Sequence, residues 1–345
     1  MRTGNELLQA TKPYLDEDRG LTWRLLAVTA AIVVALQLVA LLAPWTALKV
    51  VAAVLLGFVN IRLFIFYHDY LHGAILRRSW LGDRAMSLVG FYMLAVKSVW
   101  RETHNYHHKN NAKLLGSAIG SFPVVTVGMW RGMTDAQRRA YRIVRHPLAV
   151  FGGYFTVFLI GMTMSPFRRD PKQHWGGPVA VLLHFGIAGL VAWGFGWVSA
   201  LCAVILPQIV SMGLGSYMFF AQHNFPAMKL KGRRDWDYTF AALNSSSMFD
   251  MGPVLHWLTG NIGYHHVHHL NHRIPFYRLP AAMAGIPELQ NPGRTTWRWR
   301  DIAACLSLSV WDPDADRMLT WEELRAMQPP AARAKPAVLG LEGAS

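Results

Sequence analysis

From Gly177 to Gln222 the chain contains no Asp, Glu, Lys or Arg. A helix needs ~20 mostly apolar residues to cross the hydrocarbon core of a bilayer. This stretch is therefore long enough for two crossings joined by a short turn at 194–197. Charged residues make up only 16% of the chain, whereas about 25% is usual for a soluble domain. The sequence thus predicts an integral membrane protein.

Four apolar runs meet the length criterion, and they predict spans at residues 25–42, 46–67, 178–195 and 198–220. Two further apolar stretches, 85–99 and 150–166, are short or interrupted by charge. That pattern favours helices that lie at the membrane interface or re-enter the membrane. We therefore expect an all-α membrane protein with four transmembrane helices and a helical cap on one side.

Positive charge is distributed unevenly around these runs. The net charge is +14, and 15 Lys and Arg residues fall between His68 and His174, whereas the short turns between spans carry almost none apart from Lys49. Cytoplasmic loops carry such an excess, so both termini and the cap are predicted to be cytoplasmic. No nucleic-acid-binding module accompanies the charge, and no nucleic-acid partner is expected. We expect a cytoplasmic N-terminal segment at 1–23, a membrane domain at 24–325 and a disordered tail at 326–345.

Histidines gather in three short boxes beside the spans, and one more histidine stands apart. The boxes contain His68 and His72; His104, His107 and His108; and His265, His268 and His269, and the separate residue is His223. With four spans, all of them fall on the cytoplasmic side. An odd number of spans would separate the second box from the third, so the topology and the clustering support each other.

The spacing within the boxes predicts a site with two metal ions. Histidines four apart on a helix, such as His68 and His72, share one face and can bind one ion. Neighbours such as His107 and His108 point about 100° apart and can serve two different ions. Since a catalytic zinc needs only three protein ligands, eight or nine imidazoles indicate two ions with open positions. Iron is among the metals that imidazole binds, and it suits the activation of dioxygen against C–H bonds. Side chains that orient the ligand rings are predicted at Asp69, Asn224, Asp250 and Asn261.

The surroundings of the third box resemble the membrane-bound fatty acid desaturases, and among them the bacterial acyl-lipid desaturases. The similarity covers roughly residues 45–315 and rests on Gly260–Leu270, Arg273–Pro275, Tyr277–Leu279, Gln222–Phe225 and Trp236–Tyr238. It implies a di-iron centre that uses dioxygen and two external electrons to remove two hydrogens from an acyl chain. It also implies that His223 joins the boxes as a ligand. The remaining histidines, including His184, His266 and His272, are interpreted as packing or surface residues.

The resemblance also implies partners and a location. The substrate would be an acyl-lipid or an acyl thioester, among membrane lipids, and the membrane would be the inner membrane of a bacterium. The chain contains no His-Pro-Gly-Gly haem motif, so a separate electron donor such as ferredoxin or a haem electron carrier is expected. Residues 117–120 stand where such enzymes often carry an acidic residue, which leaves the headgroup and the double-bond position open.

Other functions are compatible with a histidine-rich membrane protein. The same boxes support oxygen insertion, so a hydroxylase or ketolase acting on a carotenoid, sterol or alkane is an alternative. A metal transporter would carry its polar ligands inside the spans, which here are almost free of them. A zinc-dependent hydrolase would need an acid/base carboxylate within a box, and Asp69 is the one candidate.

Overall fold

The computed structural model describes residues 2–114, 120–232 and 234–327. Residues 117–119 and most of the predicted disordered tail lie outside these ranges. Four helical stretches are long and apolar enough to cross a membrane: Arg19–Leu42 (α2), Thr46–His72 (α3), Pro171–Phe195 (α10, Pro171–His174, and α11, Gly176–Phe195) and Trp197–Gln222 (α12, Trp197–Ala200; η3, Leu201–Ile205; and α13, Leu206–Gln222). The predicted all-α fold with four spans is confirmed. The first and third stretches begin at Arg19 and Pro171, before the predicted 25 and 178, because their first turns contain charged and polar residues. α3 begins at Thr46 as predicted and continues past residue 67 to His72.

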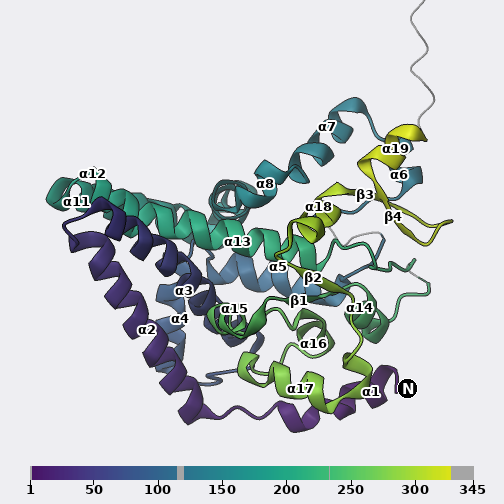
Figure 1. Ribbon diagram of the computed structural model, residues 1–345, viewed down its shortest axis with the longest axis horizontal. Coiled ribbons are helices and arrows are strands. Elements are labelled where there is room, and N and C mark those ends of the chain that lie inside the picture. The colour runs from purple at the N-terminus through teal and green to yellow at the C-terminus, as the bar shows by residue number, and fades with distance from the viewer. Residues whose placement is uncertain (1, 115–119, 233, 328–345) are drawn as a thin grey trace, which may run out of the picture.

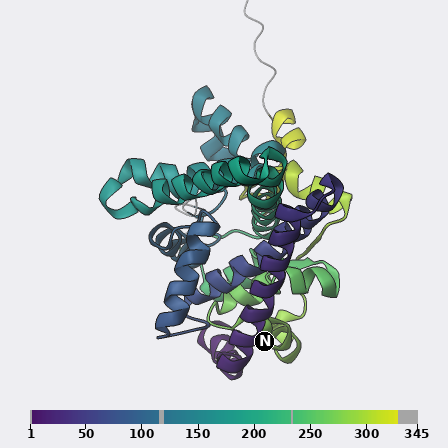
Figure 2. The same cartoon turned by 90° about the vertical axis from the view of Figure 1, so that its left-hand side faces the viewer.

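The spans form two hairpins whose turns lie at the same end of the molecule, on the left in Figure 1. Figure 2 views the molecule from that end. Gly196 has a φ of 85° at the turn between α11 and α12, a conformation that costs glycine little. At the opposite end α3 stops at Gly73, which has a φ of 68°. This stop places His72 on the last turn of α3, next to the cap.

Two helices overlap the apolar stretches, 85–99 and 150–166, that the sequence assigned to interfacial or re-entrant positions. They are α4 (Trp80–Tyr92) and the π-helical segment η2 (Tyr154–Met164). With 13 and 11 residues, both are shorter than a span requires. η2 packs against α11 and α13.

The cap lies at the end of the spans away from the turns (Figure 1). Its helices are α1 (Gly4–Ala10), η1 (Lys12–Tyr14), α5 (Lys97–Asn110), α6 (Val127–Gly132), α7 (Asp135–Val144), α8 (Pro147–Phe151), α9 (Ser165–Arg169), α14 (Tyr238–Asn244), α15 (Gly252–Leu258), α16 (His265–Leu270), η4 (Phe276–Arg278), α17 (Leu279–Gly285), η5 (Pro287–Leu289), α18 (Trp299–Ser307) and α19 (Trp321–Ala326). Strands β1 (Met248–Asp250) and β2 (Arg294–Thr296) pair in parallel, and β3 (Leu308–Asp312) and β4 (Arg317–Thr320) pair antiparallel. In the described residues, strands make only these two small sheets.

Two hydrophobic cores organise the cap. The larger one continues from the spans and surrounds the histidine boxes, with Phe66, Tyr217 and Val267 among its buried side chains. The smaller one joins α6, α7, β3, β4 and α19 around Trp130 and Leu324. These elements project together at the upper right of Figure 1. The histidine boxes therefore lie between the spans and the rest of the cap.

The arrangement predicts that the turn at Gly196 and the cap face opposite sides of the membrane. A cysteine replacing Trp197, which is exposed, is expected to react with an impermeant maleimide in spheroplasts. A cysteine replacing Arg139 on α7 should react only after permeabilisation. The native Cys202 and Cys305 are buried, so they should not react with the maleimide. Labelling of the Arg139 position before permeabilisation would refute a cytoplasmic cap.

Candidate metal centre

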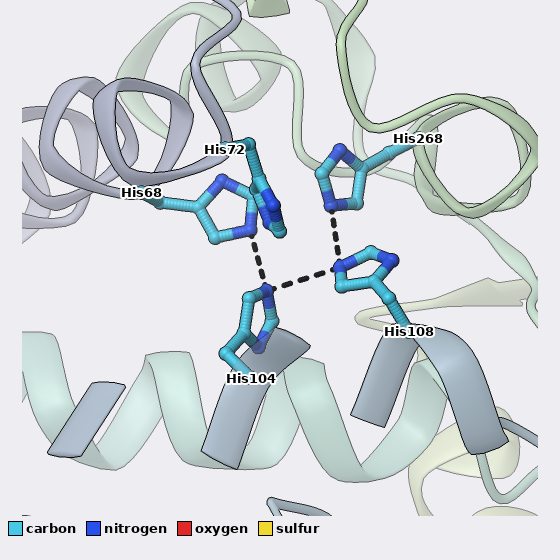
Figure 3. A group of neighbouring side chains, drawn as sticks. All are labelled: His68, His72, His104, His108 and His268. Carbon is cyan, nitrogen blue, oxygen red and sulfur yellow. Dashed lines mark hydrogen bonds between the residues drawn. The ribbon is translucent and has the colours of Figure 1, made fainter. Parts of the chain in front are cut away.

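Five histidines from three helices form the first group of candidate ligands. They are His68 and His72 from α3, His104 and His108 from α5, and His268 from α16. Each offers one ring nitrogen, and these five nitrogens all lie within 4.8 Å of one another. Figure 3 shows the rings converging from separate helices. The Nε2–Nε2 distances are 2.9 Å from His68 to His104 and 3.1 Å from His108 to both His104 and His268.

Four histidines form the second group, which lies beside the first. They are His107 from α5, His223 at the end of α13, and His265 and His269 from α16. Nε2 of His223 lies 2.8 Å from Nε2 of His265 and 3.1 Å from Nε2 of His107. The two groups touch, since the rings of His108 and His269 stack with centroids 4.4 Å apart.

Helix periodicity explains how α5 and α16 each contribute histidines to both groups. On α5, His104 and His108 are four residues apart and share a face, and His107 points away from it toward the second group. On α16, His265 and His269 share a face and His268 points to the first group. The structure thus brings together all nine histidines that the sequence singled out, and neighbours in the chain are divided between the two groups.

The geometry of the ring nitrogens fits metal ions. Two nitrogens bound about 2.1 Å from one ion and about 90° apart lie about 3 Å from each other, which is the separation observed. His72 has both ring nitrogens buried without a hydrogen-bond partner among the described residues. An unpaired buried polar group costs about 1–3 kcal/mol. Coordination of a metal ion by His72 would offset this cost.

The protonation state of the rings also fits. Burial lowers the pKa of His104, His108 and His265 well below the usual value, with further lowering from neighbouring histidines. Burial likewise lowers the pKa of His223 to about 4, against an opposing contribution from the Ser245 carbonyl. These four rings are therefore neutral at pH 7, which is the form that binds metal.

Contacts behind the rings orient some of them. Asp69 places Oδ1 3.0 Å from Nδ1 of His68, and its Oδ2 accepts a 2.7 Å hydrogen bond from the backbone N–H of Phe276. The Nδ1 of His223 lies 3.1 Å from the carbonyl oxygen of Ser245. If Nδ1 carries the proton and donates it there, Nε2 is left free for a metal.

The sequence suggested Asp69, Asn224, Asp250 and Asn261 as such supporting residues, and Asp69 alone of these contacts a box histidine. Asn224 instead bonds Arg145 and the carbonyl of Cys305, Asp250 pairs with Arg294, and Asn261 donates to the carbonyl of Phe276. Two further partners of the rings were not predicted: the Ser245 carbonyl, and the Asn111 side-chain amide, whose nitrogen lies 3.4 Å from Nδ1 of His269. A backbone carbonyl leaves no signal in a sequence.

Asp69→Asn should loosen the first group of ligands. The amide oxygen can still accept from the Phe276 backbone, but an amide nitrogen facing Nδ1 of His68 cannot accept its proton. Metal affinity should fall about 10- to 100-fold, as is typical when such a partner is lost. Iron retained per chain after dialysis against a graded chelator would measure this. Asp83→Asn, which removes an exposed carboxylate from α4, is the control, and equal retention in both variants would contradict the assignment.

A cavity of about 400 Å³ adjoins both groups of histidines. His68 and His104 of the first group and His265 of the second lie in its wall. The rest of the wall is mostly apolar and comes from α3, α5, η2 and α13, with Phe158 and Phe219 among its side chains. Its size is within the usual range for small-molecule sites, about 300–1,000 Å³. The cavity can therefore hold an apolar chain next to the candidate metal ligands.

The other histidines lie outside both groups. Nε2 of His266 lies 3.0 Å from the carbonyl oxygen of Leu289, and Nε2 of His184 lies 2.8 Å from the hydroxyl of Tyr154. The ring of His272 lies 4.7 Å from that of His72, centroid to centroid. His272 thus borders the first group, which the sequence analysis did not anticipate.

Comparison with known proteins agrees with this geometry. Residues 44–301 match the family described as fatty acid desaturase. A fatty acid desaturase from Bacillus subtilis is 29% identical over 280 residues, which cover 81% of this chain and 78% of that protein. An sn-1 acyl-lipid omega-3 desaturase (ferredoxin) from a Nostoc species is 26% identical, over 65% of this chain and 63% of its own. An sn-1 oleoyl-lipid 12-desaturase from Synechocystis is 23% identical, over 69% of this chain and 68% of its own.

Proposed function

Because the chain belongs to the fatty acid desaturase family, we propose that it introduces a double bond into the acyl chain of a membrane lipid at a centre of two iron ions. The observation that carries this proposal is one mostly apolar cavity that reaches both groups of histidines. In the balanced reaction a –CH2–CH2– unit, dioxygen, two electrons and two protons become –CH=CH– and two water molecules.

The two groups of histidines would each hold one ion. His68, His72, His104, His108 and His268 would bind one, and His107, His223, His265 and His269 the other. We propose iron because zinc has no redox chemistry and removal of hydrogen from an alkyl chain is an oxidation. When bound, the two irons supply the activation of dioxygen that C–H cleavage requires.

The chain itself positions the substrate and excludes water. Apolar side chains from α3, η2 and α13 would hold an extended acyl chain with two adjacent carbons near His68, His104 and His265. Such placement decides whether a second hydrogen is removed or oxygen is inserted, because sub-ångström differences alter reaction rates strongly. Asp69 is engaged by His68 and the Phe276 backbone, which leaves it unsuited to the acid/base role of a zinc hydrolase.

Expression in a host that lacks desaturases and contains defined saturated fatty acids tests the proposal. A new unsaturated fatty acid should appear in the lipids, and it should disappear without oxygen or when His104 is replaced by Ala. Mass spectrometry of intact lipids and thioesters would show which carrier holds the new double bond. A hydroxylated or keto product without a new double bond would refute desaturation.

We also propose that an external donor of negative surface charge, such as a ferredoxin, docks on α6 and α7. Arg131, Arg139 and Arg142 are exposed there. Behind them Arg145 is buried, and its guanidinium donates to the side chain of Asn224, the residue next to His223. This surface is thus both basic and connected through protein contacts to the second group of histidines.

Reversing the charge of this surface should selectively weaken the binding of the electron donor. With Arg139→Glu and Arg142→Glu together, the KM for reduced ferredoxin at low salt should rise about tenfold or more, because complementary charge mainly steers association. Turnover driven by a small neutral reductant should stay unchanged. Lys12→Glu with Arg234→Glu makes the same charge change elsewhere on the cap. Equal KM values in the two double variants would exclude α7 as the docking surface.

A further inference from the structure

A second pocket, of about 710 Å³, lies apart from the nine candidate metal ligands. Its wall contains Leu25 of α2, Arg62 of α3 and Trp257 of α15, with Tyr264 and Tyr277 from the third-box region. α15 packs beside α3, as Figure 1 shows. None of the nine candidate ligands contributes to this wall, so the pocket lies outside the proposed site of reaction.

Arg62 contributes a positive charge to this pocket without a nearby negative charge to neutralise it. It lies within a span, is only 3% exposed, and has no carboxylate within 4.0 Å among the described residues. Its Nε donates to the hydroxyl of Thr29 at 3.1 Å, and its Nη1 donates to the carbonyl of Trp257 at 2.5 Å. Charged side chains in spans are costly and almost always paired, so an anion is expected.

The third nitrogen of Arg62 is available to such an anion. Nη2 has no hydrogen-bond partner in the described part of the chain, it keeps some exposed surface, and Arg62 lines the pocket. The guanidinium carbon lies 4.3 Å from the ring centroid of Trp257 and 5.4 Å from that of Phe276. These aromatic contacts hold the group in place, and a fixed guanidinium is well suited to phosphate.

The surroundings favour a phosphate carried by a lipid. Arg294 on the wall pairs with Asp250 at 3.3 Å, so the three charged groups of the pocket sum to one positive charge. α15 exposes Val254 and Trp257 next to it, and tryptophan is enriched where proteins meet the membrane surface. A pocket of this charge between α2, α3 and an apolar surface helix is accessible from the lipid headgroups.

We propose that this pocket binds the phosphate group of a membrane phospholipid through Nη2 of Arg62. The ligand would also support the third-box region, because Phe276 packs on Arg62 and its backbone N–H holds Asp69. The site is separate from the acyl cavity, so lipid binding here can be tested independently of the proposed reaction. Free inorganic phosphate offers the same chemistry, and the experiment distinguishes the two sources.

Native mass spectrometry and thermal unfolding of the full chain in neutral detergent test this proposal. Dioleoylphosphatidylglycerol should bind about tenfold or more tightly than dioleoylglycerol, which has the same chains without phosphate, and should raise the Tm. Arg62→Gln should remove this preference, and Arg24→Gln, which removes an exposed cation from α2, should keep it. If inorganic phosphate alone raises the Tm of the wild type but not of Arg62→Gln, phosphate recognition is supported and free phosphate is its source.

A second variant keeps the test decisive if Arg62→Gln does not fold. Leu25→Trp fills the pocket from α2 and leaves every charge in place, so the preference for phosphatidylglycerol should be lost in a chain that keeps its metal. Equal binding of the two lipids by the wild type, or an unchanged preference in folded Arg62→Gln or Leu25→Trp, would overturn the proposal. Neither readout depends on desaturase activity.

Discussion

Replacement of His223 by alanine is expected to abolish turnover and to reduce bound iron from two ions per chain to about one. The ring lies within 3.1 Å, Nε2 to Nε2, of both His107 and His265, so its loss leaves three imidazoles in the second group. Loss of a residue that merely supports a ligand already costs about 10- to 100-fold in metal affinity, and loss of a ligand should cost more. Iron per chain and product formation measure the effect.

His266 provides the matched comparison, because it is buried, adjacent to a box ligand and outside both groups. His266→Ala would leave the Leu289 carbonyl without its 3.0 Å partner and open a cavity, at a cost of about 1–3 kcal/mol in stability. His266→Gln retains a donor and should keep both irons and most of the activity. The reverse ranking of the His223 and His266 variants would show that the ninth ligand is wrongly assigned.

Gly215→Leu is expected to block the acyl cavity without disturbing the metal centre. Gly215 lies on α13 in the cavity wall, and a Cβ added there meets no heavy atom within 4 Å. A leucine side chain can therefore enter the cavity while the backbone stays in place. Turnover of long acyl chains should fall about 100-fold, since small misplacements near the reacting atoms have effects of this size, and iron content should not change.

Gly186→Leu is the control for this experiment. Gly186 lies on α11 outside the cavity wall, and a Cβ there also meets nothing within 4 Å. Both substitutions raise helix propensity by a similar amount, so they differ in where the side chain points. If the two variants turn over long chains equally, the cavity is not where the acyl chain binds.

The properties that depend on residues close in sequence could be predicted without a structure. The four spans follow from run length, and the two hairpins from the positions of charge. The histidine pairs three and four apart follow from helix periodicity. The resemblance in the third-box region added His223, which no spacing argument includes. These features are local, so the residues that produce them are neighbours in the chain.

The properties that depend on how helices pack were decided by the tertiary structure. Spacing showed that His107 and His108 can serve different ions, but the division into groups of five and four depends on how α5 lies against α3 and α16. Asn224 was expected to support a histidine and instead meets Arg145, 79 residues away. Arg62 is one of two charged residues, with Lys49, in the apolar run 46–67, and only the packing of α15 against α3 shows that it lines a pocket. Such contacts join distant segments, and a backbone carbonyl or an open cavity leaves no residue type to recognise.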